Sequence, residues 1–66
     1  MAKWIDVTYE KPDDTRDILI VWTGEVYLGY YKPNAETWYC YEPGRTTYAF
    51  NVTHWQDLPK PPKETI

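Results

Sequence analysis

The 66-residue sequence contains no serine, one cysteine and one histidine. A single cysteine excludes an internal disulfide, and one cysteine with one histidine cannot complete a four-ligand zinc site. The absence of serine also leaves His54 without the nucleophile of a serine triad. We therefore expect a protein that is not an enzyme, with no metal site and no cofactor.

Long apolar runs and clusters of one charge are missing as well. No stretch approaches the ~20 apolar residues of a membrane helix, and the opening letters MAKWIDV lack the apolar segment of a secretory signal. Lysine and arginine total 7 against 10 acidic residues, so the net charge is −3 and no basic run is present. We expect a cytoplasmic protein that binds neither membranes nor nucleic acid polymers.

Aromatic residues are abundant, with four tryptophans, seven tyrosines and one phenylalanine. A single domain spanning residues 1–66 would bury only about 60% of its unfolded surface, so large rings have to supply much of its core. We expect the core to consist of Trp4, Trp22, Trp38, Trp55, Ile18, Ile20, Leu28 and Val52.

Short alternating segments predict a mainly β fold. The apolar run ILIVW, residues 18–22, predicts a central strand, and Thr23-Gly24 predicts a tight hairpin turn into residues 25–31. The letters TWYCYE, residues 37–42, predict the next strand, and TTYAFNV predicts a further short one. We expect a small antiparallel meander of three to four strands, with an N-terminal edge strand within residues 3–9 beside it.

Gly29 interrupts the strand expected after the hairpin turn. Glycine is unfavourable inside a strand, where it marks a bulge or a close approach by a neighbouring group. We expect a bulge or room for a ring from an adjacent strand, and the alternative is a ligand lying on the backbone.

The letters NVTHWQDLPKPPK place the only histidine beside a tryptophan, directly before a proline-rich tail. Prolines remove backbone donors and fix φ, which favours an extended polyproline II tail over a central strand. The alternative is a docking peptide for a proline-reading domain, based on the PxxP spacing of Pro59 and Pro62. We expect the tail to pack on the sheet and close the core as a clasp formed by Trp4, His54, Trp55, Pro59 and Pro62.

Seven tyrosines exceed what one face of a small sheet can bury. Tyr27, Tyr31, Tyr39 and Tyr41 alternate along neighbouring expected strands and predict one exposed stripe, with Arg45 beside it. Because tyrosine and tryptophan are enriched at binding hot spots, the stripe predicts a surface for another protein. The alternatives are a second packed face of the sheet and a surface through which copies form a homo-oligomer.

Four segments, KWIDV, DILIVWTGEVYLGYY, TWY and VTHWQDLPKPP, resemble a family of small uncharacterised proteins of tailed bacteriophages and prophages. The resemblance spans nearly the whole chain. Its most specific part is the pattern Thr-His-Trp-x-x-Leu-Pro-x-Pro-Pro from Thr53 to Pro62, whereas TYEKPDD departs from the more usual Leu-Pro. The family carries no established activity, so the resemblance implies no functional residues, only a protein made in an infected bacterium.

By analogy with small phage accessory proteins, we expect a non-catalytic protein that binds stoichiometrically and inhibits a host defence protein. The first alternative is an oligomer that sequesters a nucleotide immune signal, with rings stacked on the base and Arg16, Lys32 and Arg45 on the phosphates. The second is a structural phage component that self-assembles through its edge strands.

Overall fold

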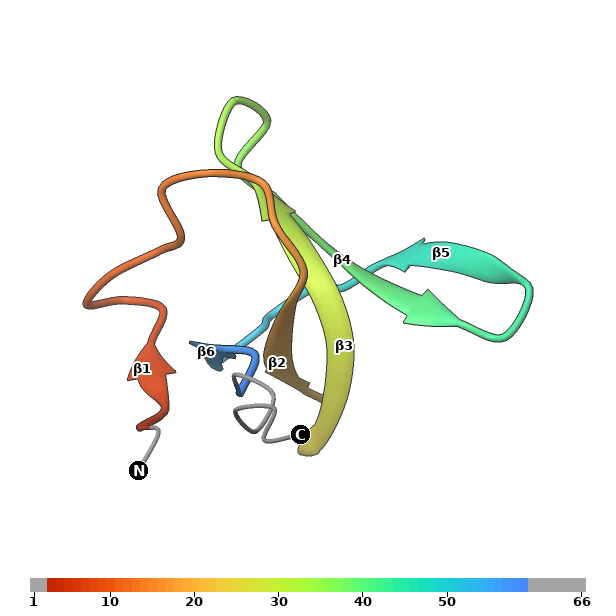
Figure 1. The fold of residues 1–66 in the computed structure, drawn as a ribbon, viewed down its shortest axis with the longest axis horizontal. Helices are drawn as coiled ribbons and strands as arrows, with labels where there is room; N and C mark the ends of the chain where they lie inside the picture. The colour runs from red at the N-terminus through yellow and green to blue at the C-terminus, as the bar shows by residue number, and fades with distance from the viewer. Residues whose placement is uncertain (1–2, 60–66) are drawn as a thin grey trace, which may run out of the picture.

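The computed structural model describes residues 3–59, which form a single antiparallel sheet (Figure 1). The spatial order of the strands is β1-β6-β2-β3-β4-β5. Their bounds are β1 (Ile5–Asp6), β2 (Ile18–Trp22), β3 (Glu25–Lys32), β4 (Thr37–Glu42), β5 (Arg45–Tyr48) and β6 (His54–Asp57). The predicted β class is confirmed, but the predicted number of three to four strands is wrong, because the described residues form six. No helix in this part of the chain could cross a membrane.

Two-residue turns set the register of the central strands. Thr23 and Gly24, with φ of 53° and 78°, turn β2 into β3 at the predicted hairpin. Pro43 and Gly44, whose φ is 80°, turn β4 into β5. Because each loop is this short, Trp22 has to pair with Glu25, and the rest of the β2–β3 register follows.

Strand β6 lies between β1 and β2 rather than outside the sheet. Its Trp55 lies opposite Ile5 on one side and Ile20 on the other. The sequence analysis predicts no strand from His54 to Asp57, although the backbone there belongs to a central strand. The predicted tail begins at Leu58, directly after this strand ends. Leu58 and Pro59 are exposed, and the rest of the predicted tail, including Pro62, lies outside the described residues.

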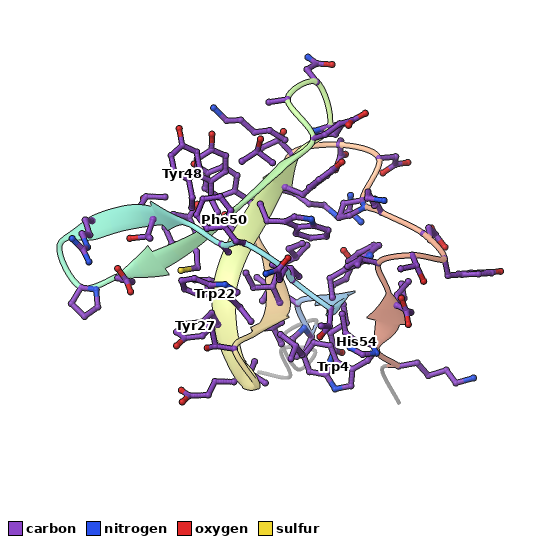
Figure 2. The ribbon with its side chains drawn as sticks, turned by 180° about the vertical axis from the view of Figure 1, so that it is seen from behind. Trp4, Trp22, Tyr27, Tyr48, Phe50 and His54 are labelled. Carbon is purple, nitrogen blue, oxygen red and sulfur yellow. The ribbon has the colours of Figure 1, made fainter. Side chains whose placement is uncertain are left out.

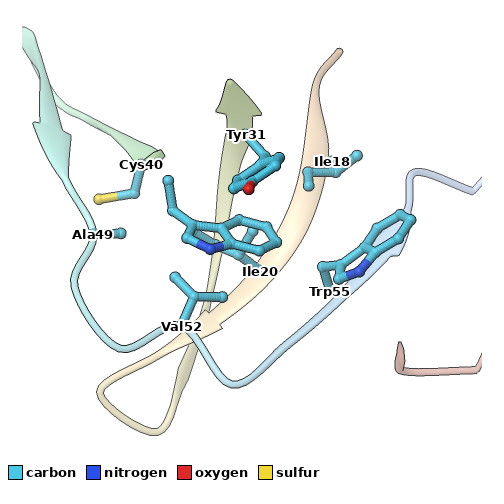
Figure 3. Close-up of a cluster of buried hydrophobic side chains, with 8 residues drawn as sticks. Ile18, Ile20, Tyr31, Cys40, Ala49, Val52 and Trp55 are labelled. Carbon is cyan, nitrogen blue, oxygen red and sulfur yellow. The ribbon is translucent and has the colours of Figure 1, made fainter. Parts of the chain in front are cut away.

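The core occupies one face of the sheet, with Ala49 and Val52 of the β5–β6 connection packed into it (Figure 3). Trp22 and Tyr27 pack against its margin. The buried side chains of the core are Ile18, Ile20, Tyr31, Trp38, Cys40, Ala49, Val52 and Trp55.

Most of the predicted core is confirmed, and two members are wrong. Trp4 is 40% exposed, since it precedes the two-residue strand β1 at the edge of the sheet. Leu28 is also exposed, because it lies opposite Leu19 on the face away from Ile18 and Ile20. Gly29 takes the core-facing position beside it, opposite Ile18 and Cys40.

Gly29 allows β4 to approach β3 closely. A Cβ atom at this position would lie 2.2 Å from the carbonyl oxygen of Tyr39 and 3.2 Å from the Cα of Cys40. The residue pairs run without a break through Gly29 on both sides. The expected bulge is therefore wrong, and the space is filled by the β4 backbone rather than by a neighbouring ring.

Candidate interaction surface

Aromatic side chains gather on the face of the sheet opposite the core. Tyr30 of β3 lies opposite Tyr39 of β4, which lies opposite Tyr48 of β5. The rings of Tyr30 and Tyr39 are stacked with centroids 4.9 Å apart, and those of Tyr39 and Tyr48 are 5.1 Å apart. Tyr41 adjoins Tyr30. Phe50 adjoins Tyr48 (Figure 2). We call these five residues, Tyr30, Tyr39, Tyr41, Tyr48 and Phe50, the aromatic row.

Much of the aromatic row is open to solvent. Phe50 is 70% exposed and Tyr48 is 54% exposed, whereas Tyr30 and Tyr39 are half-buried by their neighbours. Val26 and Leu28 extend the apolar surface along β3 on the same face. A contiguous apolar surface bordered by polar groups is typical of an interaction site.

Two phenols of the row, those of Tyr41 and Tyr39, have raised pKa values. The hydroxyl of Tyr41 donates a hydrogen bond of 2.8 Å to Oδ1 of Asp17, and this bond raises the pKa of Tyr41. Burial against neighbouring rings raises the pKa of Tyr39, whose ring lies 5.4 Å from Nζ of Lys32. Both shifts favour the neutral phenol form of Tyr39 and Tyr41.

Tyr27 and Tyr31 do not belong to this surface, so the predicted four-tyrosine stripe is wrong. Tyr31 is 3% exposed and packs on Trp38 at 4.4 Å between ring centroids. Tyr27 packs on Trp22 at the margin of the core (Figure 2). The register explains both placements, because Tyr27 lies opposite Ile20 and shares its face.

Sequence reasoning missed Tyr30, Tyr48 and Phe50. The signal for Tyr30 was available in the two-residue turn at Thr23-Gly24. Counting residues across that turn places odd-numbered residues of the following strand beside Ile18 and Ile20, and even-numbered ones on the opposite face.

Arg45 lies away from the row, on the opposite face from Tyr41. Its Nε donates a 3.0 Å hydrogen bond to Oε1 of Glu42, its partner across the β4–β5 turn. The hydroxyl of Thr47 donates to the same carboxylate at 2.6 Å. The hydrogen bonds from Thr47 and Arg45 lower the pKa of Glu42. The sequence-based placement of Arg45 beside Tyr39 and Tyr41 is therefore wrong.

Trp55 forms a clasp different from the expected one. Its ring is 2% exposed, and its Nε1 donates a 2.9 Å hydrogen bond to the carbonyl oxygen of Glu10. The guanidinium of Arg16 lies 5.7 Å from the ring centroid, while its Nε bonds Asp57 at 2.8 Å. Trp55 thus ties the β1–β2 loop to β6. Of the other predicted clasp residues, Trp4 and Pro59 are exposed and Pro62 lies outside the described residues.

His54 lines a shallow hollow at the β1 edge. The hollow encloses about 440 Å³, and Nδ1 of His54 lies 3.0 Å from the hydroxyl oxygen of Thr53. Oδ1 of Asp6 accepts bonds from the side chain and backbone of Thr8, and these bonds lower the pKa of Asp6. Asp6 is the cross-strand partner of His54, and attraction to the imidazole also contributes to the lowered pKa of Asp6. Among the described residues, no hydrogen bond joins the two side chains. Its lining residues are Asp6, Val7, Thr8, Asn51, Val52, Thr53 and His54.

Cys40 is the remaining candidate for a reactive side chain. This thiol is fully buried, and desolvation raises its pKa, as expected for a cysteine that packs as a small apolar side chain. Within residues 3–59, no group of three histidine, cysteine, aspartate or glutamate side chains could hold a metal ion.

The fold and the aromatic row define a small antiparallel β protein with an aromatic-rich surface. The chain belongs to the family described as protein of unknown function (DUF551), whose model matches residues 3–63. No curated protein and no solved structure matches the chain. The family match confirms the predicted resemblance to a family of uncharacterised proteins. It does not show the phage origin that the resemblance implies.

Proposed function

We propose that this chain is a non-catalytic binding protein that holds a protein partner against the aromatic row. The observation that carries the proposal is a set of five aromatic side chains in mutual contact on the face away from the core. Because neighbouring rings already restrict one another, binding requires little further loss of side-chain freedom. Tyrosine combines a large apolar surface with a hydroxyl, which suits the hot spots of protein interfaces.

The contacts of the row favour a protein over a nucleotide. A stacked base needs an open ring face, and the ring of Tyr39 is contacted by Tyr30, Tyr48 and Lys32. Phosphates need converging cations, but Arg45 is bonded to Glu42. Arg16 is bonded to Asp13, Asp14 and Asp57. A protein surface instead matches the exposed rings and hydroxyl groups of the row.

In the cell, the proposed role is that of a phage or prophage accessory protein in the bacterial cytoplasm. The family resemblance supports this setting. Binding to the row would be stoichiometric, and the proposed target is a host defence protein. Occupying a target requires an exposed surface, which the row provides, and no reaction chemistry.

The test is native mass spectrometry of the protein purified gently from a bacterial lysate, followed by titration with the purified partner. Truncating both exposed rings, Tyr48→Ala with Phe50→Ala, should weaken partner binding by more than about 30-fold, the loss expected for hot-spot side chains. Tyr9→Ala is the matched control, because Tyr9 is 84% exposed and makes no contact with the row among the aromatic pairs of the structure.

Tyr9→Ala should melt like the wild-type protein. The double variant should melt somewhat lower, because it loses the ring contacts of Tyr48 with Tyr39 and Phe50, but it should remain folded at the temperature of the titration. Retention of the partner by the double variant would refute the assignment of the row. A retained mass of nucleotide size, with no protein bound, would favour the sequestration of a small molecule instead.

A further inference from the structure

Strand β5 forms one edge of the sheet and has a partner on one side only. Its four residues, Arg45 to Tyr48, include no proline and no interruption of their pairing with β4. Prolines, bulges and charged side chains are devices with which edge strands prevent further pairing, and the one charge on β5, that of Arg45, is bonded to Glu42. The β4–β5 hairpin projects away from the other strands, so its outer edge is open (Figure 1). The opposite edge, β1, is only two residues long.

The ladder between β4 and β5 shows which backbone groups are free. The amide of Ala49 donates a 3.0 Å hydrogen bond to the carbonyl oxygen of Trp38. In an antiparallel pair, every second residue of a strand directs its backbone groups toward the neighbouring strand. Counting back from Ala49 in steps of two, Thr47 and Arg45 direct their backbone N–H and C=O groups toward β4. Thr46 and Tyr48 therefore direct their N–H and C=O groups outward.

We propose that two copies of this chain pair antiparallel through β5, with Thr47 of one copy facing Thr47 of the other. In this register, Thr46 bonds with Tyr48 of the second copy in both directions, which forms four backbone hydrogen bonds about a two-fold axis. The two sheets become one continuous sheet. All outward backbone groups of Thr46 and Tyr48 then have partners.

The side chains of β5 fit a second copy of the same strand. Tyr48 lies beside Thr46 of the second copy on the face of the aromatic row, so the two rows become one surface. On the other face, Arg45 lies opposite Ala49 of the second copy, and its charge is already matched by Glu42. The register therefore brings no like charges directly opposite each other. Threonine and tyrosine also favour strands.

A proline at position 46 tests the pairing. The amide of Thr46 points outward, so Thr46→Pro removes an intermolecular donor without removing a bond to β4, and edge strands tolerate proline there. Thr46→Val is the matched control, because it keeps the amide and the branched shape. Sedimentation velocity over a concentration series should show the same dimerisation for wild type and Thr46→Val. Thr46→Pro should dimerise at least ten-fold more weakly, with an unchanged melting temperature in dilute solution.

Amide hydrogen exchange of the wild-type protein gives a second test that needs no variant. The amides of Thr46 and Tyr48 should exchange more slowly as concentration rises, while the amide of Thr47 is protected equally at all concentrations. A protein that stays monomeric throughout the series overturns the proposal, and so does a dimer that Thr46→Pro leaves intact. Thr46→Pro preserves the aromatic row, so failure of this pairing leaves partner binding by the row to be judged by its own test.

Discussion

An alanine at position 29 would bring a methyl group against the backbone of the next strand. The added Cβ would lie 2.2 Å from the carbonyl oxygen of Tyr39 and 3.1 Å from Cδ1 of Ile20. The Ile20 side chain can turn away at small cost, but the Tyr39 carbonyl belongs to β4. That strand is held between β3 and β5, so relief requires a shift of the sheet itself.

The expected loss of stability follows from two opposing effects. Overpacking a buried site costs about 1–3 kcal/mol, and a backbone obstacle belongs near the upper end of that range. The change from glycine to alanine also stabilises the fold by about 0.5–1 kcal/mol, because glycine loses more conformational freedom on folding than alanine does. The net loss for Gly29→Ala is therefore about 2 kcal/mol. At about 4–8 °C per kcal/mol for a domain of this size, the melting temperature should fall by roughly 8–16 °C.

Thermal and urea unfolding, followed by tryptophan fluorescence and far-ultraviolet circular dichroism, measure this loss. Gly44→Ala is the informative control. At Gly44 an added Cβ meets nothing within 4 Å, but φ is 80°, so only left-handed strain of about 1 kcal/mol opposes the change. Gly29→Ala should therefore melt below Gly44→Ala. A Gly29→Ala variant that melts at the wild-type temperature would refute the proposed close approach of β3 and β4.

Two further predictions concern the tryptophans and the phenols. Trp55→Ala should lose about 3–5 kcal/mol in urea unfolding, because its ring is fully packed, whereas Trp4→Ala should lose well under half as much; similar losses for both would contradict the clasp at Trp55. The pKa of Tyr39 and of Tyr41 is raised in the fold, so the folded protein keeps protons that the unfolded chain releases. This contribution to stability is fully present below the ordinary tyrosine pKa of 10.0 and is lost as pH rises through the folded pKa. The urea midpoint should fall above that pH, and Tyr39→Phe should make the fall less steep.

Local sequence signals were sufficient to predict the central strands of the sheet. The apolar run from Ile18 to Trp22, followed by Thr23-Gly24, predicts both a strand and its turn, and the strand from Thr37 to Glu42 begins and ends where its letters predict. In each case the alternation, the turn residues and the β-branched or aromatic content agree.

Strand β6 could not be found in the same way. His54, Gln56 and Asp57 are polar, and prolines follow closely, so the local pattern favours an irregular segment. The strand forms because Trp55 fits between Ile5 and Ile20, which are far away in the sequence. Pairing between such distant segments leaves no periodic signal in either of them.

The composition of the aromatic row depends on a turn that does not touch it. Tyr30 and Tyr31 are neighbours in sequence, yet one stacks on Tyr39 at the surface and the other packs on Trp38 in the core. Strand alternation requires them to face opposite ways but does not say which way. The choice is made where Thr23 and Gly24, both at positive φ, force Ile20 to lie opposite Tyr27. A one-residue insertion in this turn would exchange the two faces of β3 and turn Tyr30 toward Ile18 and Ile20. The exposed tyrosines therefore follow from turn geometry as much as from the number of tyrosines.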